Sequence, residues 1–255
     1  MITAMPRIAI AIHDFEQAVS VFKEEFGMPV ADLSSRTVPS LGAHVAMCQP
    51  VSGSNIELMA PADPDKPLSQ ALQKFLAHRG EGIYAMMLEA ANPDAEAVEL
   101  LDRGLEVLPL MHGAGGRDIH PRSTHGVLVR IYPNDSVAQP KHPVSRAPNF
   151  SGIQKVVVAT RDASAVTKAY AEGLGLAAND VVMDAKRGVC SIVVRPPKGG
   201  CIELVSPVDT KQSFAAEIDT HLRTHGEGIW ALTLSATGEP AERDFQRFGT
   251  RFLVV

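Results

Sequence analysis

The sequence predicts an α+β fold in which a β-α-β-β-β module occurs four times in tandem. Two short phrases carry this prediction, because both return at the same distance along the chain. Ile56-Glu57-Leu58 recurs as Ile202-Glu203-Leu204, and Gly80-Glu81-Gly82-Ile83 recurs as Gly226-Glu227-Gly228-Ile229. Each pair is separated by 146 residues, since 202 − 56 and 226 − 80 give the same difference. A shared displacement of two phrases indicates a duplicated unit.

Length and composition agree with two globular domains. The chain has 255 residues, of which 45% are hydrophobic and 21% charged, so it has ample material for a core. A formal net charge of −5 offers no basic surface for nucleic acid or for an acidic membrane. We therefore expect neither of these partners.

The N-terminus and the cysteines bear on location. Residues 1–7 lack the basic and apolar blocks of a signal peptide, and no apolar run approaches the roughly 18 residues that a membrane helix needs. Cys48, Cys190 and Cys201 are too few and too scattered for a disulfide framework or a zinc site. The sequence therefore predicts a cytoplasmic protein with free thiols.

The first module begins with a strand over 7–12 whose two faces differ. Isoleucines alternate with Arg7 and two alanines, so one face is bulky and the other carries one cation over small side chains. Asp14 then caps a helix that Gly27 ends. Extended segments at 38–48 and 55–59 complete the module.

A linking helix over 68–78 leads to a second module, with a strand from Ile83, a helix over 93–103 and strands at 105–110 and 126–132. The second half then restarts, because Lys155 to Ala159 repeats the pattern of residues 7–11. The sequence thus predicts one domain at 1–135, a Pro-rich linker at 136–149 and a second domain at 150–255.

The fourth module is predicted to be incomplete. It has a strand at 229–234, a helix at about 240–248 and one more strand at 251–255, after which the sequence ends. The counterpart of the strand at 126–132 is therefore expected to be missing. An uncovered sheet edge favours association, so we expect a homodimer.

The first half resembles a known superfamily. The matching stretches are residues 56–61 (Ile-Glu-Leu-Met-Ala-Pro), 75–83 (Phe-Leu-Ala-His-Arg-Gly-Glu-Gly-Ile), 113–116 (Gly-Ala-Gly-Gly) and 120–129 (His-Pro-Arg-Ser-Thr-His-Gly-Val-Leu-Val). They are similar to the vicinal oxygen chelate superfamily (glyoxalase, bleomycin resistance and dioxygenase proteins), and within it to methylmalonyl-CoA epimerases. The likeness covers nearly all of 7–132 and, more weakly, 152–255. It implies that paired modules form cupped antiparallel sheets with helices outside.

The resemblance also implies a divalent metal, held by one side chain from each of four strands. The corresponding positions are Arg7, Glu57, Ala85 and Arg130, where the superfamily places His, Gln or Glu, His and Glu. Only Glu57 has a lone pair to offer a metal, since guanidinium has none and alanine has no ligand group. We therefore expect no metal cofactor in the first domain.

The second domain has lost the same ligands. Its matching positions are Lys155, Glu203 and Ala231, and the fourth is predicted to be missing. Each domain thus keeps one glutamate and gains a cation on its first strand. Lys155 and Glu203 have two open interpretations, a ligand site or a salt bridge.

Two interpretations of the first site also stay open. In one, Arg7 and Arg130 are oriented by Glu57 and bind an anionic small molecule, since arginine can grip a carboxylate with two hydrogen bonds. In the other, Arg7, Glu57 and Arg130 form a buried salt bridge that fills an empty metal site, because charges inside a protein are usually paired.

Other candidates for the site are fewer. His44 and Tyr132 are the only residues that offer a second acid/base group beside the catalytic candidate Glu57. Strand alternation, however, directs His44 away from the face of Val45, which favours a packing or surface role. The resemblance implies that His120, Arg122 and Ser123 contact a phosphate-bearing ligand; a turn rich in hydrogen bonds is the alternative. Tyr132 is also a candidate ligand-binding residue, together with Arg7 and Arg130.

Two functions from different classes are compatible with these residues. The first is a metal-independent isomerase (epimerase) or lyase that acts next to a carbonyl, on an acyl-CoA or a carboxylated small molecule. The second is a non-catalytic ligand-binding or scaffolding protein in which the metal site has become a salt bridge. An acid/base group beside Glu57 that is free to move would distinguish them.

Overall fold

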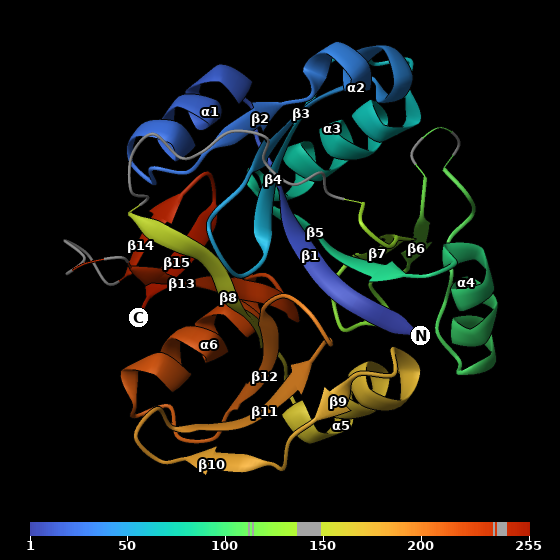
Figure 1. Cartoon of the computed structure of the whole chain (residues 1–255). Helices are drawn as coiled ribbons and strands as arrows, with labels where there is room; N and C mark the ends of the chain where they lie inside the picture. The colour runs from blue at the N-terminus through green and yellow to red at the C-terminus, as the bar shows by residue number, and fades with distance from the viewer. Residues whose placement is uncertain (112, 114, 137–148, 237, 239–243) are drawn as a thin grey trace.

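The structure is a computed structural model that describes residues 1–255 apart from 112, 114, 137–148, 237 and 239–243. It contains two β-sheets, built from separate halves of the chain (Figure 1). Most of the predicted linker, at 137–148, lies outside the described residues. Among the described helices, none is long and apolar enough to cross a membrane.

The first sheet and its helices come from residues 2–133. The strands are β1 (Ile2–Ala11), β2 (Val30–Asp32), β3 (Ala43–Cys48), β4 (Asn55–Pro61), β5 (Gly82–Ala90), β6 (Arg117–Ile119) and β7 (Val129–Pro133). The helices are α1 (Phe15–Glu24), α2 (Ser34–Leu41), α3 (Pro67–Arg79) and α4 (Pro93–Asp102).

The second sheet and its helices come from residues 150–254. The strands are β8 (Phe150–Ala159), β9 (Ala177–Ala178), β10 (Val182–Asp184), β11 (Val189–Arg195), β12 (Cys201–Pro207), β13 (Gly228–Ala236), β14 (Asp244–Arg247) and β15 (Thr250–Val254). The helices are α5 (Ala163–Lys168), the short π-helix η1 (Ala169–Gly173) and α6 (Ser213–Thr224).

The two sheets repeat one strand order. The first runs β2-β3-β4-β1-β5-β7-β6, and the second runs β10-β11-β12-β8-β13-β15-β14, with β9 beside β11. In both, the first strand pairs in parallel with the last strand of its own module and antiparallel with the strand that opens the next module. The predicted α+β fold of tandem β-α-β-β-β modules is confirmed, but both sheets are mixed rather than antiparallel as expected.

Local predictions of the first module are partly right. Asp14 caps α1 by accepting a hydrogen bond from the Gln17 backbone at 2.9 Å, and Gly27 adopts a left-handed φ of 67° after the helix. The strand predicted from residue 38 begins only at Ala43, because residues 34–41 form α2, which ends at Gly42 with a φ of 72°. In the second module, the strand predicted at 105–110 does not form, and Val107 makes a single bridge to Ile119.

The fourth module is not short of a strand, contrary to the prediction. Strand β15 pairs with β13 in parallel, as β7 does with β5, so β15 is the counterpart that was expected to be missing. Residues 244–247 form β14 rather than the predicted helix. Residues 237 and 239–243, which include the start of that predicted helix, lie outside the described residues. The homodimer stays a prediction, but the missing strand no longer supports it.

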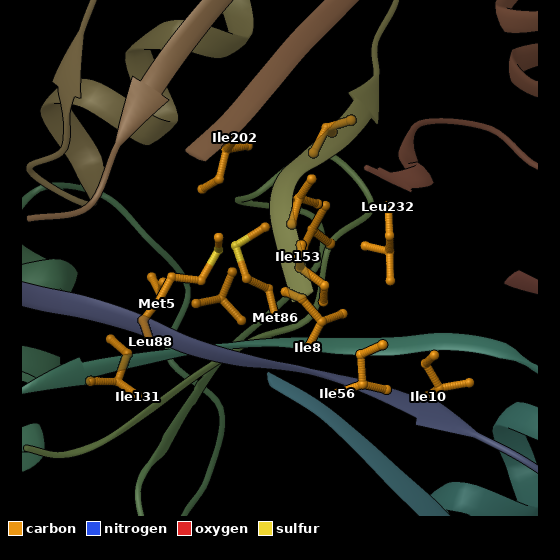
Figure 2. Packing of buried hydrophobic residues seen from close by; sticks show 14 of the residues in the cluster. Met5, Ile8, Ile10, Ile56, Met86, Leu88, Ile131, Ile153, Ile202 and Leu232 are labelled. Carbon is orange, nitrogen blue, oxygen red and sulfur yellow. The ribbon is translucent and has the colours of Figure 1, made fainter. Parts of the chain in front are cut away.

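The core lies between the two sheets. Figure 2 shows Ile8 and Ile56 of the first sheet on one side of this core, with Ile153, Ile202 and Leu232 of the second sheet on the other. All five side chains are completely buried. The bulky face predicted for β1 is therefore shared by both halves of the chain.

The opposite face of the first sheet holds the small residues of β1. Ala9 and Ala11 pack there with Leu72 and Leu76 of α3. We call this face the first cup, and we call the matching face of the second sheet, on which Val157 packs with Ile218 of α6, the second cup. Because alanine leaves room for a helix to approach, each cup is covered over part of its area by the helix that joins its two modules.

Two glycines let the halves touch backbone to backbone. Gly249 has a φ of 61°, and a Cβ atom there would lie 1.8 Å from the carbonyl oxygen of Glu81. Gly126 has a φ of 85°, and its Cβ would lie 1.8 Å from the carbonyl oxygen of Glu227. The contact repeats across the duplication, so no side chain fits at either crossing.

Gly249→Ala should lower the free energy of unfolding by about 3 kcal/mol or more, because it adds a backbone clash to the strain of a left-handed residue. Urea unfolding measures the loss. Gly226→Ala is the matched control, since Gly226 has a φ of 79° but nothing within 4 Å of its Cβ position. Its cost should be about 1–2 kcal/mol. Equal losses in the two variants would show that the crossing is not tightly packed.

Candidate functional site

One row of side chains crosses the first cup. Arg7 of β1 lies opposite Met87 of β5, Met87 lies opposite Arg130 of β7, and Arg130 lies opposite Asp118 of β6. Glu57 of β4 lies opposite Ala9 in the neighbouring row. The strand register therefore brings both predicted arginines and the predicted glutamate to one face, as the sequence indicated.

Arg7 is held by three groups at once. Its Nε donates to Glu57 Oε2 at 3.0 Å, its Nη1 donates to Ser136 Oγ at 2.7 Å, and its guanidinium lies 4.5 Å from the centre of the Tyr132 ring. Burial acts to lower the pKa of Arg7, but the charge and hydrogen bonds of Glu57 and Tyr132 outweigh it, and the pKa is raised. Arg7 is therefore a permanent cation.

Arg130 does not pair with Glu57, which corrects the predicted three-residue salt bridge. Its Nη2 donates to Asp118 Oδ2 at 3.0 Å, and its Nε lies 2.9 Å from Asp118 Oδ1. The guanidinium also lies 5.6 Å from the centre of the Tyr132 ring. The Tyr132 ring thus lies against both guanidinium groups. The site consists of two separate ion pairs rather than one salt bridge of three charges.

The cluster is closed and its charges are balanced. Arg7 and Arg130 are each 4% exposed, Glu57 is 7% exposed and Asp118 is 9% exposed. Burial raises the pKa of Asp118 more than the adjacent Arg130 lowers it. Two cations face two carboxylates, so the surplus of positive charge that an anion site needs is absent from these four side chains.

His44 lies outside the cluster, so the structure agrees with the packing role that strand alternation favours and not with the catalytic role for which it was a candidate. Its ring centre lies 5.1 Å from that of Phe15 in α1. Strand register places it opposite Ala60, whose side chain belongs to the core between the sheets. Because β3 alternates, His44 and Glu57 project from opposite faces, and His44 cannot exchange a proton with a ligand in the cup.

His120, Arg122 and Ser123 form a turn after β6. The Arg122 backbone N–H donates to His120 Nδ1 at 3.0 Å, and the Glu106 backbone N–H donates to Ser123 Oγ at 2.7 Å. His120 Nδ1 also lies 3.9 Å from the Glu106 carboxylate. These contacts lie within the turn or join it to Glu106 of the preceding loop. They support its interpretation as a hydrogen-bonded turn.

The second cup holds its own ion cluster. Glu203 is 3% exposed and accepts hydrogen bonds from Lys155 Nζ at 2.9 Å and from Arg187 Nη2 at 2.6 Å. Burial acts to raise the pKa of Glu203, but the two cations together outweigh it and hold the pKa below its usual value. The fourth position, expected to be missing, is Leu253, because Leu253 pairs with Thr233 as Arg130 does with Met87.

Sequence reasoning missed Asp118 and Arg187. Asp118 lies in β6, a strand of only three residues after Gly115 and Gly116 that side-chain alternation does not reveal. Its position directly opposite Arg130 in a hairpin is the signal that could have found it. Arg187 lies in the turn between β10 and β11, where spacing gives no indication of its partner.

The side chains present do not fit a divalent metal. The four positions that would hold it carry Arg7, Glu57, Ala85 and Arg130, and the extra carboxylate of Asp118 is bound to Arg130. Across the described residues, no group of three or more His, Cys, Asp and Glu side chains could hold a metal ion. Glu57 is then the one carboxylate at these positions that does not bind Arg130. One carboxylate falls short of the three or four ligands that such sites need.

Comparison with known proteins agrees with the strand order. Residues 7–120 match the family model described as Glyoxalase/Bleomycin resistance protein/Dioxygenase superfamily. The chain is therefore similar to this superfamily over residues 7–120, which is less than half of its length. Its matched part includes Arg7 and Glu57 but ends before Arg130. No curated protein sequence matches the chain.

Solved glyoxalase-fold structures resemble the chain. A mutant of 4-hydroxymandelate synthase from Streptomyces coelicolor is 15% identical, with a TM-score of 0.66 over 93% of this chain and 72% of its own. A Streptomyces coelicolor methylmalonyl-CoA epimerase is 28% identical, with a TM-score of 0.45 over 55% of this chain and 100% of its own. A Mycobacterium tuberculosis methylmalonyl-CoA epimerase is 25% identical, with a TM-score of 0.41 over 55% and 91%. The first likeness shows that the tandem fold extends through both halves of the chain.

The two cups should respond to pH in opposite directions. The pKa of Asp118 is raised in the folded state, so the stability that it contributes relative to asparagine should fall as pH rises above about 3.9. The pKa of Glu203 is lowered, so its contribution relative to glutamine should be complete above about pH 4.3 and be lost as pH falls through its folded-state value.

Urea unfolding of Asp118→Asn, Glu203→Gln and the parent protein over a pH series measures both slopes. The difference between parent and variant should decrease with rising pH for Asp118→Asn and with falling pH for Glu203→Gln. If the difference in unfolding free energy changed in the same direction with pH for both variants, burial would not be the dominant influence on the pKa of Asp118.

Proposed function

We propose that this chain is a non-catalytic ligand-binding or scaffolding member of the glyoxalase superfamily, in which two ion pairs replace the metal. The observation that carries the proposal is the closed, charge-balanced cluster in the first cup. Arg7 and Glu57 form one pair and Arg130 and Asp118 the other, with Tyr132 against both. The two pairs balance the four charges without a ligand, although Arg130 Nε makes no hydrogen bond.

The energetics of buried ions support this proposal. Removing one partner of a buried pair leaves the other charge desolvated, at a cost of about 3–5 kcal/mol. A proton taken from a substrate would neutralise the Glu57 carboxylate that balances Arg7, and Arg7 is too buried for water to compensate its charge. The closed pair is therefore a stable resting state and a poor general base.

One observation favours the second candidate, a metal-independent isomerase or lyase acting next to a carbonyl. The remaining hydrogen bond of Arg7 goes to the hydroxyl of Ser136, a neutral group that a ligand carboxylate could displace. The Ser136 hydroxyl in turn donates to Glu89 Oε1 at 2.7 Å. If an acyl-CoA or carboxylated small molecule took that place, Arg7 would bind it and Glu57 would lie beside it as the base.

Proton exchange distinguishes the two candidates. The protein is incubated in D2O with a panel of acyl-CoAs and short carboxylic acids, and exchange at the carbon next to the carbonyl is followed by NMR. We expect no enzyme-dependent exchange, because no free base faces the ligand. Exchange that disappears in Glu57→Gln but persists in Glu203→Gln would establish the isomerase or lyase instead.

A metal titration tests the proposed loss of the metal site. Cobalt(II) added to the parent protein and to Glu57→Gln should give the same visible absorption, because one carboxylate does not make a binding site. Elemental analysis after dialysis provides the second readout. One tightly bound cobalt per chain in the parent protein, lost in Glu57→Gln, would overturn the proposal.

A further inference from the structure

A groove lies where the two halves of the duplication meet. It has a volume of about 290 Å³, at the lower end of the range for small-molecule sites. Its floor includes the glycines at which the two backbones cross. Its walls come from the C-terminal ends of α3 and α6 and from the first residues of β5 and β13. The groove is lined by Ala85 of the first cup but by none of the charged side chains of the two ion clusters.

The two walls are chemically different although they are copies of one another. At the 146-residue offset, Phe75 corresponds to His221 and Tyr84 corresponds to Trp230. On the first half, Phe75 and Tyr84 pack edge to face at 5.3 Å, which makes an aromatic wall. On the second half, His221 stacks with His225 at 5.0 Å, which places two imidazoles at the groove.

Arg79 is the available permanent cation of the groove. Its side chain is exposed, and within the described residues it has no ion pair or hydrogen bond. Arg251 also lines the groove, but its charge is already paired. Its guanidinium binds Asp244 and Glu217 and lies 4.4 Å from the centre of the Trp230 ring. An anion in the groove would therefore meet Arg79 first.

The two carboxylates of the groove are tied into turns. Glu81 accepts the backbone N–H of His13 at 2.7 Å, and Glu227 accepts that of Arg161 at 2.8 Å. Glu227 also lies 2.9 Å from His125 Nδ1. Both carboxylates thus serve the turns that precede α1 and α5, and neither bonds to Arg79, His221 or His225.

The geometry points to this groove as a binding site for a small carboxylate with an apolar body. The carboxylate lies toward Arg79, His221 and His225. The apolar body packs against Phe75 and Trp230. This inference rests on the proposed ligand-binding function and supplies its site and ligand class. A carboxylate can accept hydrogen bonds from guanidinium and imidazolium, and aromatic side chains give the apolar remainder its burial.

His221 couples this site to pH. Burial, followed by the nearby charges of His225 and Arg79, lowers the pKa of His221 to about 4, so the ring is neutral at pH 7. A bound anion would offset the charge of Arg79 and favour the imidazolium form of His221. Affinity should therefore rise as pH falls. The other charged or titratable groups around the groove are Glu81, Tyr84 (pKa raised by burial to about 12), Glu217, Glu227, Asp244 and Arg251.

The experiment is a calorimetric titration of the full chain with phenylacetate and with hexanoate, at about pH 5 and about pH 7.5. Phenylacetamide is the neutral counterpart. Both acids should bind, more tightly at the lower pH, and the amide should bind at least about tenfold more weakly, the scale of one charged hydrogen bond. The His221 ring signals should shift on addition of phenylacetate in NMR spectra.

Matched variants locate the binding. Arg79→Met and His221→Phe should each weaken phenylacetate binding about tenfold at the lower pH. His221→Phe introduces the residue that the first half carries at the same place, so the fold has a precedent for it. Lys74→Met and His78→Phe are exposed changes on α3 that do not line the groove, and they should leave binding unchanged.

Three results would overturn the inference: no heat from either acid, equal weakening in the control variants, or weakening in Arg130→Met alone, which would put the ligand in the first cup. Its failure is distinct from failure of the proposed function. Proton exchange dependent on Glu57 would refute the non-catalytic role and leave binding in the groove standing. Absence of binding would leave the result of the exchange experiment unaffected.

Discussion

Strand β1 is buried on both of its faces, and the rest of the structure depends on how it divides its side chains between them. Ile8, Ile10 and Ile12 enter the core that both sheets share, whereas Arg7 and Ala9 face the first cup. A strand buried on two sides gives its one charged residue no route to water. Arg7 therefore requires a carboxylate within hydrogen-bonding distance, and Glu57 on the adjacent parallel strand provides it.

The same requirement explains Asp118 and why the sequence did not reveal it. A second buried arginine, Arg130, needs its own carboxylate, because Glu57 is already used by Arg7 and Tyr132 lies against both guanidinium groups. Charge balance alone predicts that such a residue exists. Its identity depends on the pairing of β6 with β7, a contact between a three-residue strand and its neighbour that hydrophobic periodicity cannot show.

Other parts of the fold were accessible from the sequence for a definite physical reason. The repeated phrases and the alternation of β1 arise from regular geometry, so they predicted the tandem modules and the two faces correctly. The prediction for the end of the chain was wrong, because the counterpart of β7 is present as β15, in parallel pairing with β13. Such pairing is a long-range contact that hydrophobic periodicity does not show.

Duplication explains why the boundary between the halves is the place where new recognition chemistry can arise. Each cup must satisfy its own buried charges and pack its own covering helix, which constrains residues such as Glu57 and Glu203. At the groove, the backbone crossings at Gly126 and Gly249 are fixed by close contact. The side chains around them are partly exposed and free to differ between copies, as Phe75 and His221 do. A pair of equivalent walls can thus come to differ, one with the aromatic pair Phe75 and Tyr84 and the other with the imidazoles His221 and His225, without any change to the fold.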